Sequence, residues 1–362
     1  MMIRTIHVGC MGFAGGRLQG LALCKGLEPM ACVDVEVEAA KEAVRELQAR
    51  FPDWFPAGFE KRVYRTIREA LERHEAEACL IYAPTTVHAE LVVESLSLGL
   101  HTLCVKPIAT SQAEFRSIVE AHRARPELLL VQGQNKRWNP AAAKMREWLQ
   151  EPHGIGTFLG GECRFWIRQN LSRQKPKIPD VYLEGLFFHS AASHQLDQLV
   201  AALGLPAFVT ARVHRRRDES LGQRGVWGTA GGAAMLEFES GVCFCYTGTR
   251  AGHGSPFWWS GSWTFHGEEG DILRDGGHLQ LFRRGEVVED VNLQDLHPGL
   301  IEDDRIQFEA FARAIATGEG REWLQGTTLD TWILMEACNV SARNGERVDV
   351  AAFKEEMFGK GY

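Results

Sequence analysis

The stretch IRTIHVGCMGFAGG, residues 3–16, decides the fold. Its apolar run, Ile3 to Val8, predicts a buried strand, and the segment from Gly15 to Lys25 predicts the helix that follows. The turn between them contains Gly9, Gly12 and Gly15. Backbone N–H groups at the start of a helix favour an anion, and glycines let that anion approach the backbone closely. The stretch therefore predicts a phosphate-binding turn after the first strand of a parallel sheet.

The spacing of these glycines is G-x-x-G-x-x-G, so Met11 stands near the usual second glycine position or the turn is one residue longer. A purely structural glycine turn is an equal alternative at this point. Asp34 favours the binding interpretation, because it ends the second predicted strand 22 residues after Gly12. A carboxylate there accepts hydrogen bonds from the ribose hydroxyls of NAD and repels the 2′-phosphate of NADP. No arginine follows it, so NAD is favoured over NADP, with an exposed helix-capping aspartate as the alternative.

Short apolar strands alternate with amphipathic helices over the first third of the chain. Strands are predicted at residues 3–8, 30–33, 78–83, 103–105 and 128–132, and capping boxes at 66–69 and 111–114 open two of the helices. Strands that are apolar throughout are typical of a parallel sheet covered by helices on both faces. Residues 1–134 are therefore predicted to form a doubly wound α/β Rossmann domain.

The pattern changes after about Asn135. Strands separated by tight turns are predicted at 157–165, 208–213, 233–239, 242–247, 262–266 and 278–282, with helices at 190–203, 304–317 and 328–344. Successive strands joined by short turns form an antiparallel sheet. Residues 135–362 are therefore predicted to form an α+β domain with a large, mostly antiparallel open sheet, whose closing helices can pack back on the first domain.

The bulk properties exclude several classes of protein. The 362 residues carry a net charge of −7, whereas nucleic acid and anionic membranes require a basic surface. No apolar stretch reaches membrane-spanning length and the first residues carry no apolar signal core, so we expect a cytoplasmic protein. The nine cysteines are an odd number and mostly scattered, which fits a reducing cytosol better than a disulfide framework.

Two motifs lie at the ends of predicted strands in the first domain. One is Ala83-Pro84-Thr85-Thr86-Val87-His88, and the other is Cys104-Val105-Lys106-Pro107. Ligands of open α/β sheets bind beyond the carboxyl ends of the strands. A lysine at that edge can hydrogen-bond both a cofactor ribose and a substrate hydroxyl, although a lysine taken singly is more often a surface residue.

At these residues the sequence resembles the Gfo/Idh/MocA family of dehydrogenases, which act mostly on sugars and polyols. Residues 83–88 match its TPxxxH element, residues 99–107 its GkhVlcEKP element and residues 135–140 its N-x-R-F-x-P element. The resemblance continues through 194–197, 238–241 and the closing helices, and so covers almost the whole chain. It implies a nucleotide-binding oxidoreductase of the sugar dehydrogenase type, whose second domain binds the substrate and forms a homodimer or homotetramer.

The motifs and the resemblance together give a set of candidate site residues. Those expected to bind NAD are Gly9, Gly12, Phe13, Ala14, Gly15, Asp34, Pro84, Thr85, His88 and Lys106. Those expected to bind the substrate are Arg137, Trp166, Ser190, His194 and Asp197. The resemblance implies that Lys106 and His194 are the catalytic residues.

The family's D-x-G-x-H-x-x-D helix corresponds to residues 190–197, where Ser190 replaces the first aspartate, and Val105 replaces the glutamate before Lys106. The resemblance implies that Lys106 and His194 meet above the nicotinamide, where His194 takes the hydroxyl proton of the substrate. Histidine suits this role because its unperturbed pKa, ~6.5, lies near working pH. Loss of the aspartate removes a charge that favours the imidazolium, so we expect a different substrate geometry or weaker dehydrogenase activity.

We expect no metal site. Glu184, His189, His194 and Asp197 are the candidate ligands, but the five-residue gap between the histidines does not place both on one helical face. His189 is expected to be a buried structural histidine, with partial substitution for the missing aspartate as the alternative. The aromatic run at 257–263 can stack on a sugar ring, although sheet core or a subunit interface is the more common use of such a run.

Three functions stay open on the sequence. The leading one is an NAD(H)-dependent oxidoreductase acting on a sugar, a polyol or a related cyclic alcohol. The second is a non-catalytic NAD-bound sensor of a sugar or a partner protein, which the losses at Val105 and Ser190 favour. The third is an NAD-using glycosidase of the same family, which releases an aglycone without net formation of NADH.

Overall fold

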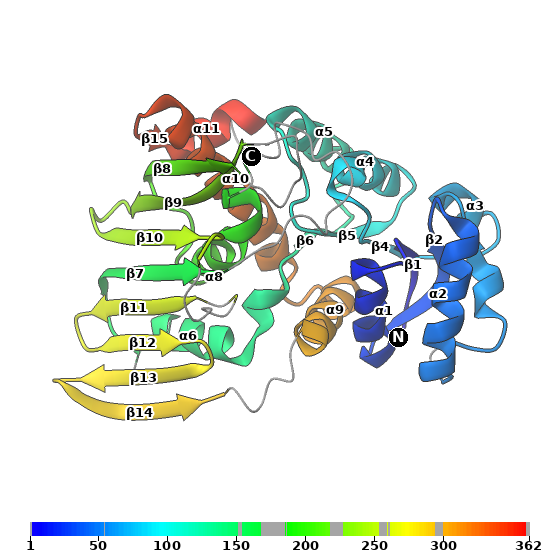
Figure 1. Ribbon diagram of the computed structural model, residues 1–362, viewed down its shortest axis with the longest axis horizontal. Helices are drawn as coiled ribbons and strands as arrows, with labels where there is room; N and C mark the ends of the chain where they lie inside the picture. The colour runs from blue at the N-terminus through cyan, green and yellow to red at the C-terminus, as the bar shows by residue number, and fades with distance from the viewer. Residues whose placement is uncertain are drawn as a thin grey trace. The chain divides into compact units, whose positions relative to one another are not determined.

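The structure is a computed structural model that describes residues 2–53, 55–150, 154–167, 185, 187–217, 227–252, 259, 261–293 and 300–359. The chain divides into two compact units (Figure 1). The first contains residues 1–135 and 298–328, and the second contains residues 136–297 and 329–362. The chain first passes between the units beside the boundary expected at 134, and a later segment returns to the first unit.

The first unit is built on a six-stranded parallel sheet. Its strands are β1 (Ile3–Val8), β2 (Leu27–Val33), β3 (Val63–Tyr64), β4 (Ala78–Ile81), β5 (His101–Val105) and β6 (Leu130–Gly133). They lie in the order β3-β2-β1-β4-β5-β6, and every neighbouring pair is parallel. This is the doubly wound Rossmann order, and it confirms the predicted fold of the first domain.

Helices cover both faces of this sheet. They are α1 (Phe13–Leu23), α2 (Val37–Arg50), α3 (Ile67–Leu71), α4 (His88–Ser97), α5 (Gln112–Arg123) and α9 (Leu300–Thr317). Helices α1, α2 and α9 form one layer, and α4 and α5 form the other (Figure 1). The two predicted capping boxes are confirmed, since Thr66 Oγ1 and Ser111 Oγ each accept a hydrogen bond from a main-chain N–H three residues later.

The second unit contains a nine-stranded sheet. Its strands are β7 (Phe158–Trp166), β8 (Phe208–Arg217), β9 (Trp227–Glu237), β10 (Cys243–Thr249), β11 (Ser262–Gly267), β12 (Asp271–Asp275), β13 (His278–Arg283), β14 (Glu286–Asn292) and β15 (Val348–Asp349). They lie in the order β14-β13-β12-β11-β7-β10-β9-β8-β15. Only β7 and β10 pair in parallel within this sheet as described, which confirms the predicted, mostly antiparallel architecture.

Sequence patterning missed three of these strands, of which β15 has only two residues. Strand β12 (DILRD) and strand β14 (EVVEDVN) carry many charges and few apolar residues. Strand β14 is an edge strand whose side chains are mostly exposed, so burial imposes no apolar pattern on it.

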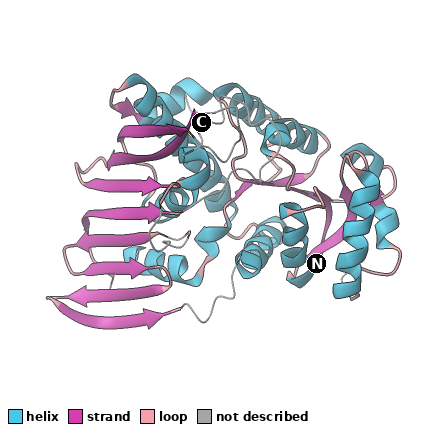
Figure 2. Ribbon diagram, in the orientation of Figure 1, coloured by secondary structure: helices cyan, strands magenta, loops and turns pink. Residues whose placement is uncertain are grey.

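Helices cover one face of the nine-stranded sheet. The helices of this unit are α6 (Pro140–Gln150), α8 (Ser193–Leu203), α11 (Val350–Phe358) and most of α10 (Arg321–Asn344), and Figure 2 shows them gathered on one side of the strands. On β10, Phe244 and Tyr246 point into this covered face and are buried, whereas Cys245 and Thr247 are exposed on the other. None of the described helices is long and apolar enough to span a membrane.

Candidate active site

The glycine turn of the first unit is shaped by close contacts. Gly9 has a φ of 90°, and a Cβ atom there would lie 2.7 Å from the carbonyl oxygen of Tyr82. A Cβ at Gly15 would lie 2.9 Å from the carbonyl oxygen of Cys10. Gly12 has a φ of 57° and is the N-cap of α1, where no side chain caps the helix. Helix α1 begins at Phe13, two residues earlier than predicted. The backbone N–H groups of its first turn therefore face the glycine turn.

Asp34 is fixed beside this turn. Its Oδ2 accepts a hydrogen bond from the backbone N–H of Cys10 at 3.0 Å, and its Oδ1 accepts one from the N–H of Glu36 at 3.0 Å. Each carboxylate oxygen has a second lone pair with which to accept a further hydrogen bond. The structure thus brings the predicted ribose-binding acid and the predicted phosphate-binding turn together.

His88 joins the two loops that follow β4 and β5. Its Nδ1 lies 2.8 Å from the carbonyl oxygen of Pro107, and its Nε2 lies 2.8 Å from that of Ala83. The imidazole is 1% exposed, and burial lowers its pKa. His88 therefore acts by holding the loops that carry Pro84 and Lys106, and Pro84 itself caps a short 3-10 helix at Thr85–Val87.

Lys106 follows β5 at the carboxyl edge of the parallel sheet and is half-buried. Burial, together with the positive charge of Arg17, lowers the pKa of Lys106 to about 8. An amine with that pKa changes its protonation state close to neutral pH. Such a lysine is suited to exchanging a proton with a substrate or to stabilising an alkoxide. The sequence alone did not predict this lowered pKa.

The buried ion-pair partner of Arg17 was not predicted from the sequence either. Arg17 lies on α1 and forms a buried ion pair with Asp304 on α9, and Asn135 hydrogen-bonds the same carboxylate. The signal was present in the sequence, because Arg17 lies on the same helical face as Ala14 and Leu21, which are buried. A charged residue on an apolar helical stripe indicates a buried partner.

A dinucleotide fits these residues of the first unit. At Gly9 the backbone of the turn lies so close to the Tyr82 carbonyl that a Cβ atom would collide with it. Helix α1 has no side-chain cap at its N-terminus, and the fixed carboxylate of Asp34 lies beside the turn. An anionic pyrophosphate and a ribose require those two features. Ala14 is buried in α1, while the side chain of Phe13 and all of Glu184 lie outside what the structure describes.

In the second unit, Arg137 and Asp197 are paired with each other. The Arg137 Nε donates to Asp197 Oδ2 at 2.8 Å, its second nitrogen donates to Oδ1, and Thr331 Oγ1 donates to Oδ1 at 3.0 Å. Both residues are buried, and Asp197 is 0% exposed. Burial raises the pKa of Asp197, and Arg137 and Thr331 oppose that rise. The two predicted substrate ligands thus hold helix α8 in the core.

His194 lies in the first turn of α8, directly after one turn of π-helix at Phe187–Ala191. Its imidazole is 9% exposed, and Ser190 in the π-turn is 5% exposed. Ser193 Oγ donates to the carbonyl oxygen of Ser190 at 2.8 Å, which ties the π-turn to the helix. The structure places Ser190 and His194 on consecutive turns, as the motif predicted.

His189 is a buried structural residue, as favoured above. Its Nε2 lies 3.2 Å from Glu336 Oε2, and its ring stacks on Trp332 with centroids 5.8 Å apart. Although burial opposes ionisation, His189 and Arg343 lower the pKa of Glu336 to about 2. Within the described ranges, no three histidine, cysteine or acidic side chains are grouped so that they could hold a metal ion.

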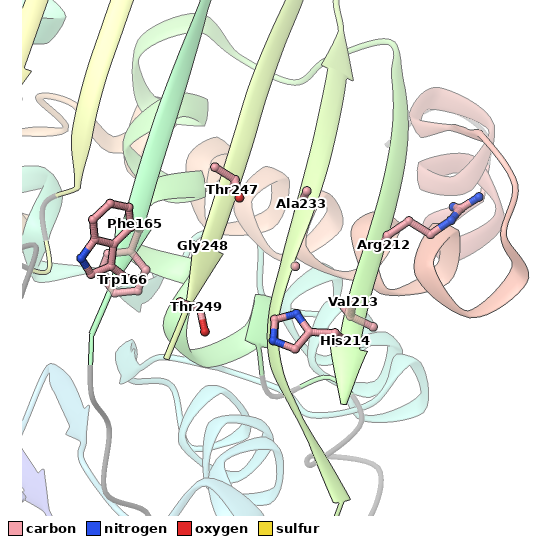
Figure 3. A pocket seen from close by; sticks show the side chains of 10 residues that line it. Phe165, Trp166, Arg212, Val213, His214, Ala233, Thr247, Gly248 and Thr249 are labelled. Atoms are coloured by element: carbon pink, nitrogen blue, oxygen red, sulfur yellow. The ribbon is translucent and has the colours of Figure 1, made fainter. Parts of the chain in front are cut away.

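Trp166 lies on the exposed face of the sheet, away from α8. It borders a cavity of about 460 Å³ whose other walls include His214, Thr247 and Thr249 (Figure 3). The preceding residue, Phe165, points to the covered face, where it packs against Trp259. The alternation of strand side chains therefore separates Trp166 from His194, and the structure does not bring these two predicted residues together.

Residues 3–132 match the family model described as "Oxidoreductase family, NAD-binding Rossmann fold". The inositol 2-dehydrogenase 3 of Saccharopolyspora erythraea is 28% identical over 220 residues, which is 60% of this chain and 59% of that protein. An uncharacterised oxidoreductase of Schizosaccharomyces pombe is 28% identical over 43% of this chain and 42% of its own length. The chain thus spans between two fifths and three fifths of these curated relatives.

Solved structures share the fold over nearly the whole chain. An oxidoreductase from Agrobacterium radiobacter in complex with NAD⁺, L-tartaric acid and magnesium superposes with a TM-score of 0.80 at 19% identity, covering 97% of this chain and 99% of that one. Levoglucosan dehydrogenase in complex with NADH and levoglucosan gives a TM-score of 0.75 at 19% identity, covering 97% and 100%. The first unit thus matches a family model of NAD-binding oxidoreductases, and the chain as a whole shares the fold of these solved structures.

Proposed function

We propose that this protein is an NAD(H)-dependent oxidoreductase that interconverts a secondary alcohol and a ketone on a sugar, a polyol or a related cyclic compound. The observation that carries the proposal is the lysine at the end of β5, because Lys106 lies at the ligand-binding edge of the sheet and has a pKa of about 8. The names of relatives agree with this substrate class, since they include inositol 2-dehydrogenases and levoglucosan dehydrogenase.

The cofactor is held by the first unit in this proposal. The turn of Gly9, Gly12, Phe13, Ala14 and Gly15 would hold the pyrophosphate, Asp34 would hold the ribose, and the loops of Pro84, Thr85 and Lys106, which His88 joins, would hold the nicotinamide. When bound, NAD supplies the acceptor for a hydride. Asp34 favours NAD over NADP, because its charge repels a 2′-phosphate.

Two side chains act on the substrate hydroxyl. His194 accepts the hydroxyl proton as the hydride leaves the same carbon, and the C–O bond becomes a carbonyl. The Lys106 ammonium donates a hydrogen bond to that oxygen and stabilises the negative charge that develops on it. Ser190 lines the substrate site one turn before His194, and the Arg137–Asp197 pair positions the helix that carries His194.

The test is substrate oxidation by the wild type and by single variants. Lys106→Ala is expected to lower kcat/KM by about 10²–10⁴-fold while the dissociation constant of NADH changes little, because Lys106 acts mainly on the transition state. Lys106→Arg keeps the charge and serves as the matched control. A Lys106→Ala enzyme with unchanged turnover contradicts the assignment.

A non-catalytic NAD-bound sensor is the second candidate function. The observation that favours it is the hydroxyl of Ser190, which stands where the related pattern has a carboxylate. Tight NAD binding without turnover on a broad panel of sugars and polyols supports the sensor, whereas reduction of NAD by any of them excludes it.

We propose that a second copy of the chain covers the exposed face of the nine-stranded sheet, giving a homodimer or a homotetramer. That face carries exposed apolar side chains, including Leu159, Met235 and Leu273. Light scattering at micromolar concentration tests the assembly, and a monomer contradicts it.

We also propose a cytoplasmic location. The nine cysteines are all free, which agrees with that location.

A further inference from the structure

An aromatic side chain lies directly beside His194. The indole of Trp259 and the imidazole of His194 have centroids 5.7 Å apart and planes at 83°, an edge-to-face contact. Trp259 also packs against Phe165 on β7, with ring centroids 5.8 Å apart and ring planes at 39°. Trp259 as a whole residue is only partly buried.

The backbone of Trp259 is anchored to the same helix as His194. Gln195, the next residue of α8, donates a hydrogen bond from its Nε2 to the carbonyl oxygen of Trp259. Its Oε1 accepts a hydrogen bond from the hydroxyl of Tyr246 at 3.3 Å. Gln195 is 0% exposed and Tyr246 is 2% exposed, so both amide atoms of Gln195 are engaged in the core. The indole is therefore fixed relative to His194 by a buried hydrogen-bond chain.

Two ion pairs lie among the described residues of this part of the second unit. Asp197 and Arg137 are paired with each other, and His189 is paired with Glu336. The position that carries a carboxylate in the related pattern is Ser190. An aromatic wall beside a hydroxyl and an imidazole suits a polyhydroxylated ring, whose C–H face is apolar and whose hydroxyls form hydrogen bonds.

We propose that Trp259 determines substrate specificity by stacking on the C–H face of a neutral ring, a cyclitol or a pyranose, and so turns a ring hydroxyl toward His194. Gln195 is a positioning residue that acts through Trp259. This inference rests on the proposed function, because it takes His194 as the proton acceptor. A flexible open-chain polyol has no such flat C–H face, so the wall selects rings over open chains.

The experiment compares ring substrates with an open-chain one. Steady-state kinetics with NAD are measured for myo-inositol and levoglucosan as rings and sorbitol as the open chain. Trp259→Leu is expected to raise KM for the rings about tenfold, with kcat changing less and sorbitol kinetics unchanged, and Trp259→Phe is expected to keep most of the ring preference. Trp323→Leu, at a partly buried tryptophan of the first unit, is the matched control.

Gln195→Glu tests the anchor. The ionised carboxylate still accepts from Tyr246 but does not donate to the Trp259 carbonyl. It is expected to raise KM for the rings by a smaller factor than Trp259→Leu, again without an effect on sorbitol. An equal loss on rings and sorbitol indicates a general structural effect and overturns the positioning role.

The outcomes separate the two proposals. If Lys106→Ala abolishes turnover but Trp259→Leu leaves the preference for rings intact, the inference fails and the proposed function stands. If the wild type oxidises none of the three compounds, the proposed function fails for this substrate class, and saturation-transfer NMR of the same sugars then tests the wall. Ring-proton signals that are lost in Trp259→Leu support the inference, and signals that persist, or that are absent in the wild type, overturn it.

Discussion

The candidate residues of the first unit and those of the second unit differ in how their polar side chains are held. In the first unit, Asp34 and Lys106 lie at the edge of the sheet, and Asp34 is held by the main-chain N–H groups of Cys10 and Glu36. In the second unit, Asp197 is fully buried and is held by the side chains of Arg137 and Thr331. A carboxylate fixed by the backbone keeps lone pairs for a ligand, whereas one enclosed by side chains serves the core. The same residue type thus has a binding role in one unit and a structural role in the other.

The largest effect expected from this comparison is on stability in the second unit. Asp197→Ala leaves the Arg137 guanidinium buried beside an empty carboxylate site, so it is expected to lower the free energy of unfolding by about 3–5 kcal/mol. Denaturant unfolding measures this. The matched change in the first unit, Asp34→Ala, is expected to cost less than about 1 kcal/mol and to weaken NAD binding instead. Equal losses of stability at both positions contradict the comparison.

Acid is expected to act on the second unit through Glu336. Its pKa falls from 4.5 to about 2 on folding, so its stabilising contribution is complete above pH 4.5 and is lost as the pH falls toward 2. The shift corresponds to about 3 kcal/mol. Unfolding free energies measured across this window are expected to fall more steeply in the wild type than in Glu336→Gln. Parallel curves for the two proteins show that the His189–Glu336 pair does not contribute.

The glycine turn offers a pair of substitutions with opposite signs. Gly9→Ala places a Cβ 2.7 Å from the Tyr82 carbonyl at a positive φ, and is expected to destabilise the protein by about 2 kcal/mol and to weaken NADH binding. Gly16→Ala lies in α1 with no heavy atom within 4 Å of the added Cβ, and is expected to stabilise the protein by about 0.5–1 kcal/mol. Thermal unfolding and NADH titration measure both. The same sign for both variants contradicts the close-contact account.

The smallest effect concerns the pH profile of the reaction. The Lys106 ammonium is expected to be the active form, and its pKa is about 8, so kcat/KM is expected to fall about tenfold per pH unit above that value. Arg17→Gln removes one of the two causes of the low pKa, so the falling limb is expected to move to higher pH. Because burial is the larger cause, the apparent pKa of the falling limb is expected to stay below the ordinary lysine pKa of 10.5. A limb that stays in place shows that Lys106 is not the group that titrates.

The two halves also differed in how far the sequence could predict them. The turn, Asp34 and the edge position of Lys106 followed from local spacing, because a strand, a turn and a helix are consecutive in the chain. The Arg137–Asp197 pair joins residues 60 positions apart, and the Arg17–Asp304 pair joins residues 287 apart. Side-chain pairing at such separations depends on packing, which periodicity does not encode, so the sequence assigned Arg137 and Asp197 to the substrate.

Strand alternation explains a further difference. Trp166 was predicted to bind the substrate, but it borders a cavity on the exposed face of the sheet (Figure 3). The aromatic residue that lies beside His194 is Trp259, within a run for which core packing was the favoured interpretation. The register of a strand decides which face a residue occupies, and a shift of one residue reverses it.

Hydride transfer itself is the most direct test of the account. The wild type is incubated with NAD and a cyclic polyol that carries deuterium on its carbinol carbons, and the reduced cofactor is analysed by mass spectrometry. The account predicts reduced cofactor that contains one deuterium atom, and almost none of it with Lys106→Ala. Reduced cofactor without deuterium, or equal amounts from Lys106→Ala and the wild type, would contradict it.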